Sequence, residues 1–171
     1  LEIIQSCQED AGWFRQAEPA DFMPDILKQE NNLLMIYRDI PYQTVRGFGG
    51  ALTQAAAWNY AQMPAELRQQ FLRACYSDEG LCYGWGRTPI GSCDFSPVEY
   101  SYCDAPGDTG LHTFSVQEDA KYQLALIQAV QAYRGAPLTL LASPWSPPAW
   151  MKTNGERCGG GELLPQYYAL W

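Results

Sequence analysis

The sequence predicts an α/β fold in which parallel strands alternate with helices. Three apolar segments typical of strands, residues 45–50, 81–89 and 138–142, are separated by two segments with the residue spacing of helices. Strands and helices that alternate along a chain indicate a parallel sheet with the helices packed outside it. An open doubly wound sheet and the first part of a (β/α)₈ barrel both fit this order.

The ends of the helical segments carry recognisable signals. Thr53 is the expected N-cap of the helix after the first strand, and Gly80 is expected to close the first helical segment. Before the second segment, Ser115 and Glu118 have the spacing of a capping box, in which each side chain bonds the other's backbone amide. Gly135 is expected to end that helix in a left-handed conformation.

The first 43 residues fall outside the alternating pattern. Residues 1–5 and 33–39 are apolar enough to form strands, whereas residues 12–24 are interpreted as a polar, proline-containing loop. The N-terminal portion is therefore expected to supply one or two antiparallel strands placed before the main fold.

Composition limits the classes of partner. Hydrophobic residues make up 47% of the 171 residues, and the net charge is −8 with a single His. An acidic chain lacks the basic face that nucleic acids or anionic membranes require. No apolar run approaches the ~20 residues of a membrane-spanning helix. Frequent aromatic residues, at 13%, suit either an aromatic core or a site for flat-faced neutral substrates such as sugars.

No cofactor or metal is expected. The glycines of residues 47–50 read Gly-Phe-Gly-Gly, which lacks the spacing of a dinucleotide-binding loop. One His and six scattered cysteines lack the ligand spacing of a zinc site. The cysteines are interpreted mostly as free, buried thiols, which favours a cytoplasmic over a secreted protein and leaves the localisation open.

Polar and aromatic side chains lie at or just past the carboxyl ends of the second and third predicted strands, where a barrel places its binding surface. They are Arg87 near the end of the second strand, Ser92 and Asp94 after it, and Ser143, Trp145 and Trp150 after the third. Asp94 can accept hydrogen bonds from vicinal hydroxyls or bond the amides of its own turn. Arg87 can hold a carboxylate ionised or form a structural ion pair. Trp145 can stack on a sugar ring or pack in the core.

A catalytic pair of carboxylates is not identified by spacing. A glycosidase requires two carboxyl groups at a controlled separation, and Asp94 with Glu156 is one conceivable pair that nothing in the spacing selects. Three strands also cannot close a barrel, which needs about 250 residues. The chain is therefore expected to be a fragment.

Three collinear motifs carry a resemblance to a known family. VRGFGGALTQAAA, GRTPIGSCDFS and LLASPWSPPAWMKTNG resemble, in this order and spacing, glycoside hydrolase family 30, the glucosylceramidase-like enzymes. The resemblance runs from about Thr44 to the end of the chain. It implies that residues 44–171 are the N-terminal part of a (β/α)₈ TIM barrel, with about three strands. Residues 1–43 would then be strands of a β-rich side domain.

The resemblance also implies an activity. Family members are retaining β-glycosidases that use two glutamates, one of them in an Asn-Glu-Pro context, and both would lie beyond the end of this chain. The substrate would be a β-glucoside, either glucosylceramide-like or a β-glucan. The partners would be that substrate, the remaining barrel strands and the β side domain, with no nucleic acid and no membrane span. The fragment alone is expected to be inactive.

The matched motifs imply roles for four residues. Arg87 would support the nucleophile glutamate, Asp94 would hold glycone hydroxyls, and Trp145 would line the sugar site. Phe95 matches a neighbouring substrate-binding position. A non-catalytic carbohydrate-binding or interaction module that uses the Trp-rich loop 140–155 is the alternative.

Overall fold

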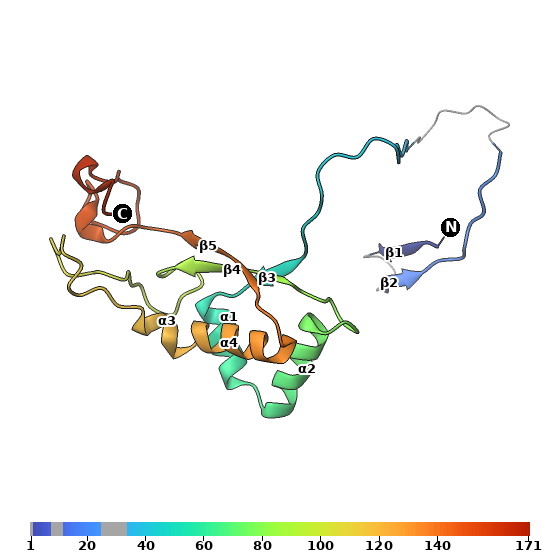
Figure 1. Cartoon of the computed structure of the whole chain (residues 1–171), viewed down its shortest axis with the longest axis horizontal. Coiled ribbons are helices and arrows are strands. Elements are labelled where there is room, and N and C mark those ends of the chain that lie inside the picture. The colour runs from blue at the N-terminus through green and yellow to red at the C-terminus, as the bar shows by residue number, and fades with distance from the viewer. Residues whose placement is uncertain (1, 8–11, 25–33) are drawn as a thin grey trace. The chain divides into compact units, whose positions relative to one another are not determined.

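The computed structural model describes residues 2–7, 12–24 and 34–171 (Figure 1). Contacts within the chain divide it into two units, Leu1–Gln43 and Thr44–Trp171. Each unit is described by itself.

The N-terminal unit contains one antiparallel strand pair. Strand β1 (Ile4–Cys7) pairs with β2 (Gly12–Gln16), with Ile4 opposite Gln16. The prediction of a loop over residues 12–24 was therefore wrong at its start, where Trp and Phe favour a strand. The strand predicted at residues 33–39 was also wrong over its described part, because residues 34–39 pair with no described strand. An apolar run forms a strand only where a partner satisfies its backbone.

The second unit is built on a parallel sheet in the order β3-β4-β5, as the alternation predicts. Its strands are β3 (Gly49–Ala51), β4 (Trp85–Ile90) and β5 (Thr139–Pro144). Arg87 in the central strand lies opposite Ala51 on one side and Leu141 on the other. β3 and β4 begin later than predicted, at Gly49 and Trp85, and the amides of Gly84 and Trp85 both donate to the Phe48 carbonyl where this pairing starts.

Helices cover one face of this sheet (Figure 1). They are α1 (Gln54–Gln62), α2 (Ala65–Tyr76), α3 (Gln117–Lys121) and α4 (Gln123–Arg134), followed by the 3₁₀ turns η1 (Ala149–Met151) and η2 (Pro165–Tyr167). The core between sheet and helices consists of eight buried side chains: Leu52, Ala57, Leu72, Tyr76, Leu126, Ile127, Val130 and Leu138. In the described part of the chain, no helix lies over the opposite face, where Leu141 is 59% exposed.

Two of the predicted helix ends are confirmed and two are wrong. The Thr53 hydroxyl accepts a hydrogen bond from the Ala56 amide at 3.2 Å, and Gly135 has φ 62°. Gly80 is not the cap of α2, because that helix ends four residues earlier at Tyr76. The Ser115–Glu118 capping box does not form.

The failed capping box has a local cause. Ser115 accepts from the Gln117 amide at 3.2 Å, and the Glu118 carboxylate pairs with Lys121 instead of reaching back. The helical segment also breaks at Tyr122 (φ −139°, ψ −51°), which divides it into α3 and α4. After residue 164 the chain forms only the short turn η2.

Alternation along β4 decides which side chains face the helices. The Thr88 hydroxyl accepts a hydrogen bond from the Gln123 side chain in α4 at 2.6 Å, so Thr88 faces the helical layer. A Cβ at Gly86 would lie 2.8 Å from Leu52 Cδ1 and 3.0 Å from Leu138 Cδ2, on the same side. Because successive side chains point to opposite faces, Arg87 points to the open face.

We expect Gly86→Ala to destabilise the protein by about 1–3 kcal/mol, because the added methyl overpacks the core. Gly84→Ala is the matched control, since a Cβ there meets only the flexible Arg134 tip at 3.6 Å. Urea denaturation of the full chain measures both free energies of unfolding. Equal stability of the two variants would contradict the packing described for β4.

Candidate functional site

Arg87 lies within β4 beside Trp145, which directly follows β5; Arg87 and Ser143 thus lie inside their strands and not after them. The Arg87 Nε donates to the Ser143 hydroxyl at 3.3 Å, and its Cζ lies 5.7 Å from the centre of the Trp145 ring. A small hollow here is lined by Ala51, Thr53, Arg87, Pro89, Cys93 and Trp145. The cation over the ring fixes the indole without covering it, and Trp145 stays 47% exposed. An exposed indole beside a guanidinium suits the flat face of a polar ligand.

Asp94 and Phe95 occupy the tip of a turn that begins at Cys93. The Ser96 amide donates to the Cys93 carbonyl at 3.1 Å, and the Cys93 amide donates to the Ser96 hydroxyl at 3.1 Å. The Phe95 carbonyl accepts from the Ala55 amide at 2.9 Å, which docks the turn on the first turn of α1. Asp94 thus lies one residue from the hollow of Arg87 and Trp145.

The Asp94 carboxylate is not used by its own turn. Both Asp94 and Phe95 are exposed, and no hydrogen bond joins the Asp94 side chain to another residue in the described ranges. The interpretation of Asp94 as a residue that bonds local amides therefore loses its basis. An exposed carboxylate held on a docked turn can accept hydrogen bonds from a ligand.

The loop between β4 and α3, which contains the Cys93 turn, is anchored by a buried carboxylate that the sequence analysis did not single out. Asp119 in α3 is 4% exposed and accepts hydrogen bonds from the hydroxyls of Tyr100 and Tyr102. Burial, followed by the bond to Asp119, raises the pKa of Tyr102 to about 12 and also raises the pKa of Tyr100. Both phenols therefore remain protonated donors across the neutral range.

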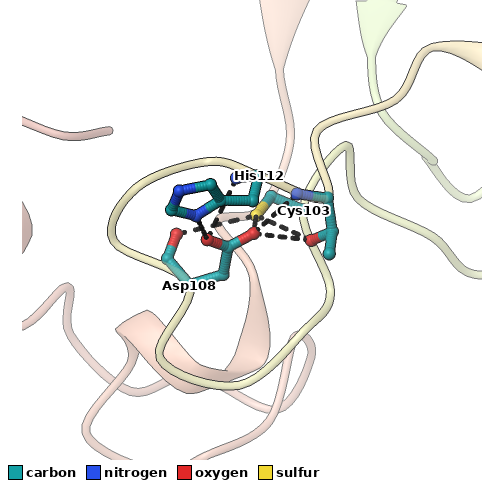
Figure 2. Close-up of polar contacts among 4 residues, drawn as sticks. Cys103, Asp108 and His112 are labelled. Atoms are coloured by element: carbon teal, nitrogen blue, oxygen red, sulfur yellow. Dashed lines mark hydrogen bonds and ion pairs between the residues drawn. The ribbon is translucent and has the colours of Figure 1, made fainter.

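A second cluster holds the outer part of the same loop (Figure 2). The Asp108 carboxylate accepts from the Thr113 amide at 2.7 Å, the Thr113 hydroxyl at 2.8 Å and the His112 amide at 3.0 Å. It also faces His112 Nδ1 at 3.0 Å and the Cys103 thiol at 3.5 Å. The Thr113 amide and hydroxyl, with the His112 amide, hold the pKa of Asp108 well below its usual range. The Asp108 carboxylate lies between the Cys103 thiol and the His112 imidazole, so these two residues do not form a cysteine–histidine pair. We call Cys103, Asp108, His112 and Thr113 the loop clamp, because their hydrogen bonds hold this part of the loop.

The thiols differ from the expectation of mostly buried cysteines. Cys75, Cys82, Cys93, Cys103 and Cys158 are free, but among these five only Cys103 is buried, and Cys82 and Cys158 are exposed. Across residues 2–7, 12–24 and 34–171, no three His, Cys, Asp or Glu side chains gather as metal ligands would. Nor does any helix of these ranges have the length and hydropathy of a membrane span.

A parallel sheet with helices over one face only, and with polar and aromatic side chains near its strand ends, is the arrangement of a β/α barrel, because a doubly wound sheet carries helices on both faces. Comparison with known families identifies the family within the class of β/α-barrel proteins. The family described as Glycosyl hydrolase family 30 TIM-barrel domain matches residues 45–169, and the chain belongs to this family. The predicted resemblance is thereby confirmed, as is the fold class of an N-terminal part of a (β/α)₈ barrel.

Curated relatives match the same region. Putative glucosylceramidase 4 of Caenorhabditis elegans is 42% identical over 135 residues, covering 76% of this chain and 26% of that protein. Lysosomal acid glucosylceramidase of Mus musculus is 40% identical over 135 residues, covering 78% of this chain and 26% of that protein. The chain spans about a quarter of the length of these relatives.

Solved structures share the fold. SrfJ from Salmonella typhimurium superposes with a TM-score of 0.71 at 38% identity, over 75% of this chain and 29% of that chain. The endo-β1,6-glucanase BT3312 superposes with a TM-score of 0.66 at 32% identity, over 77% of this chain and 30% of that chain.

We expect Asp108→Asn to abolish the part of the acid-induced loss of thermal stability that comes from the loop clamp. Because the folded pKa of Asp108 lies below its unfolded value, its stabilising effect is present above about pH 4 and is lost as the pH falls further. Thermal unfolding of the full chain between about pH 6 and pH 2 measures this dependence. Asp94→Asn, which removes an exposed carboxylate, is the control. An acid dependence in Asp108→Asn as steep as in the unmodified protein would contradict the clamp.

Proposed function

We propose that this chain is the N-terminal part of the catalytic domain of a retaining β-glycosidase that hydrolyses β-glucosides. Its two catalytic glutamates would lie in the part of the protein that follows this chain. The observation that carries the proposal is the hollow shared by Arg87 and Trp145 at the strand ends, with Asp94 on the adjoining turn. Membership of glycoside hydrolase family 30 agrees with it.

Each proposed role follows from the chemistry of the side chain. The exposed Trp145 indole would stack on the apolar face of the glucose ring. The exposed Asp94 carboxylate would accept hydrogen bonds from two neighbouring hydroxyls of the glycone. Arg87 donates only to Ser143 within the described residues, so its remaining N–H groups could hold the nucleophile glutamate ionised. Phe95, 60% exposed, would border the glycone.

The aglycone is the finer part of the proposal. The names of the curated relatives point to glucosylceramide, and that of one solved structure points to a β-1,6-glucan. A β-linked glucose is common to both, so a β-glucoside is the substrate class proposed. Residues 1–43 would supply strands to a β-rich side domain and residues 44–171 the first part of the barrel.

The alternative, a non-catalytic carbohydrate-binding module, has less support. Leu141 is 59% exposed on the open face of the sheet, beside the exposed Arg87. Both β3 and β5 pair with a strand on one side only among the described residues. A self-sufficient module would cover such a face and such edges.

We expect Asp94→Asn to lower kcat/KM for an aryl β-glucoside by about 100-fold, because two charge-assisted hydrogen bonds to the glycone are weakened. The assay uses the full-length protein that contains this chain, with the α-glucoside as substrate control. Glu156→Gln removes the same charge from an exposed position on the next loop and should remain as active as the unmodified enzyme. Near-normal kinetics in Asp94→Asn would remove Asp94 from the site.

We expect Arg87→Lys to lower kcat about 10- to 100-fold and to move the acidic limb of the kcat/KM profile to higher pH. A lysine replaces a planar fork by a point charge, so the ionised nucleophile is less stabilised and its pKa rises. The pH–rate profile of the full-length enzyme measures both effects. An unchanged rate and profile would count against the proposed support of the nucleophile.

A further inference from the structure

The candidate site is assembled from two loops whose mutual position is not set by the sheet alone. The first loop follows β4 and carries Asp94 and Phe95, and the second follows β5 and carries Trp145. A ligand that touches both Asp94 and Trp145 requires the two loops to keep a fixed separation. Hydrogen bonds between the loops are therefore part of the site's geometry.

The first loop is closed at its base by Ser92 and Tyr100. The Ser92 amide donates to the Tyr100 carbonyl at 3.1 Å, and the Tyr100 amide donates to the Ser92 hydroxyl at 3.1 Å. Asp94 lies inside this closed segment. Ser92 is 5% exposed and Tyr100 also 5%, so both bonds are shielded from water. A displacement of Ser92 therefore displaces the turn that carries Asp94.

The second loop is folded around the carbonyl of Arg157. That carbonyl accepts from the Ser146 hydroxyl at 2.5 Å and from Lys152 Nζ at 2.9 Å. Ser146 directly follows Trp145 in the chain. The backbone of Arg157 is thus fixed relative to the residue that would face the sugar.

One side chain joins the two closed segments. The Arg157 guanidinium donates through Nη2 to the Ser92 hydroxyl, the same oxygen that receives the Tyr100 amide. A hydroxyl oxygen has two lone pairs, and these two donors occupy both. We propose that Arg157 is a positioning residue, whose hydrogen bond to Ser92 couples the Trp145 loop to the Asp94 turn. The consequence for catalysis rests on the proposed glycosidase function, whereas the coupling itself does not.

The surroundings of Arg157 do not suit a purely stabilising role. No carboxylate in residues 2–7, 12–24 and 34–171 forms an ion pair with it, and its Nε is buried without an acceptor there. A buried donor that lacks an acceptor lowers stability. The Arg157 guanidinium therefore connects the two loops even though its unpaired Nε lowers the stability of the fold.

The coupling is tested by amide hydrogen exchange in the full-length protein. In Arg157→Met, which keeps the apolar stem and removes every donor, the amides of residues 92–100 should exchange about tenfold faster, as expected for loss of a contact within one hydrogen-bond network. Arg157→Lys, which restores one donor, should recover most of the protection. Arg68→Gln is the matched control, because Arg68 is a half-buried arginine of α2 that bonds the Met63 carbonyl and lies over the Tyr60 ring.

Unchanged exchange of residues 92–100 in Arg157→Met would overturn the proposal. So would an equal loss of protection in Arg68→Gln, which would mean a general loosening of the protein. Both outcomes are independent of enzymatic activity. If the full-length protein hydrolyses no β-glucoside, the proposed function fails while the exchange data still decide the coupling.

The positioning role is tested by kinetics on a β-glucoside. Arg157→Met should raise KM and lower kcat/KM about tenfold, with Arg157→Lys intermediate and Arg68→Gln unchanged. In the cycle of Arg157→Met, Ser92→Ala and the double variant, the double loss should be much smaller than the product of the single losses. Multiplicative losses, or an unaltered kcat/KM in Arg157→Met alongside faster exchange, would overturn the positioning role.

Discussion

Alternation of side chains along β4 is the constraint on which the rest of the structure depends. Gly86 and Thr88 face the helices, and Arg87 between them faces the open side. A shift by one residue would bury the guanidinium against Leu52 and Leu138 and expose the packing face, so the register is strongly specified. The same register places Arg87 beside Leu141 and within reach of Ser143 and Trp145. Core packing and the chemistry of the site are thus fixed by one strand.

Polar contacts connect the sheet to the helices and to the loop after β4. Gln123 donates to the Thr88 hydroxyl and to the Pro89 carbonyl, which ties α4 to the end of β4. In α3, one buried carboxylate receives two tyrosine hydroxyls from the loop after β4, a network that is costly to leave half-formed. The loop is long but anchored at its base, which is what a binding surface on a barrel rim requires.

The sequence predicted those features that depend on neighbouring residues. The alternating order of strands and helices, the Thr53 N-cap and the left-handed Gly135 follow from spacing or from a single backbone conformation, and the structure confirms them. The capping box at Ser115 failed because Lys121 competes for the Glu118 carboxylate. The prediction of a strand at residues 34–39 failed because an apolar run in a sequence does not reveal whether a partner strand is present. Arg87 and Trp145 were placed together by the rule for strand ends, which is a rule of topology.

Arg157 could not be found in this way, and the reason is physical. Its contact with Ser92 spans 65 positions in the chain, and no periodicity or spacing relates the two residues. In a β/α barrel each strand contributes its own loop, so a ligand site built from several loops receives no fixed geometry from any single segment. Long-range hydrogen bonds between the loops must supply that geometry before the ligand binds. Ordering the loops only on binding would cost conformational entropy and weaken the affinity. A guanidinium suits this task, since it has several donors on a long stem and stays charged at any pH the protein meets.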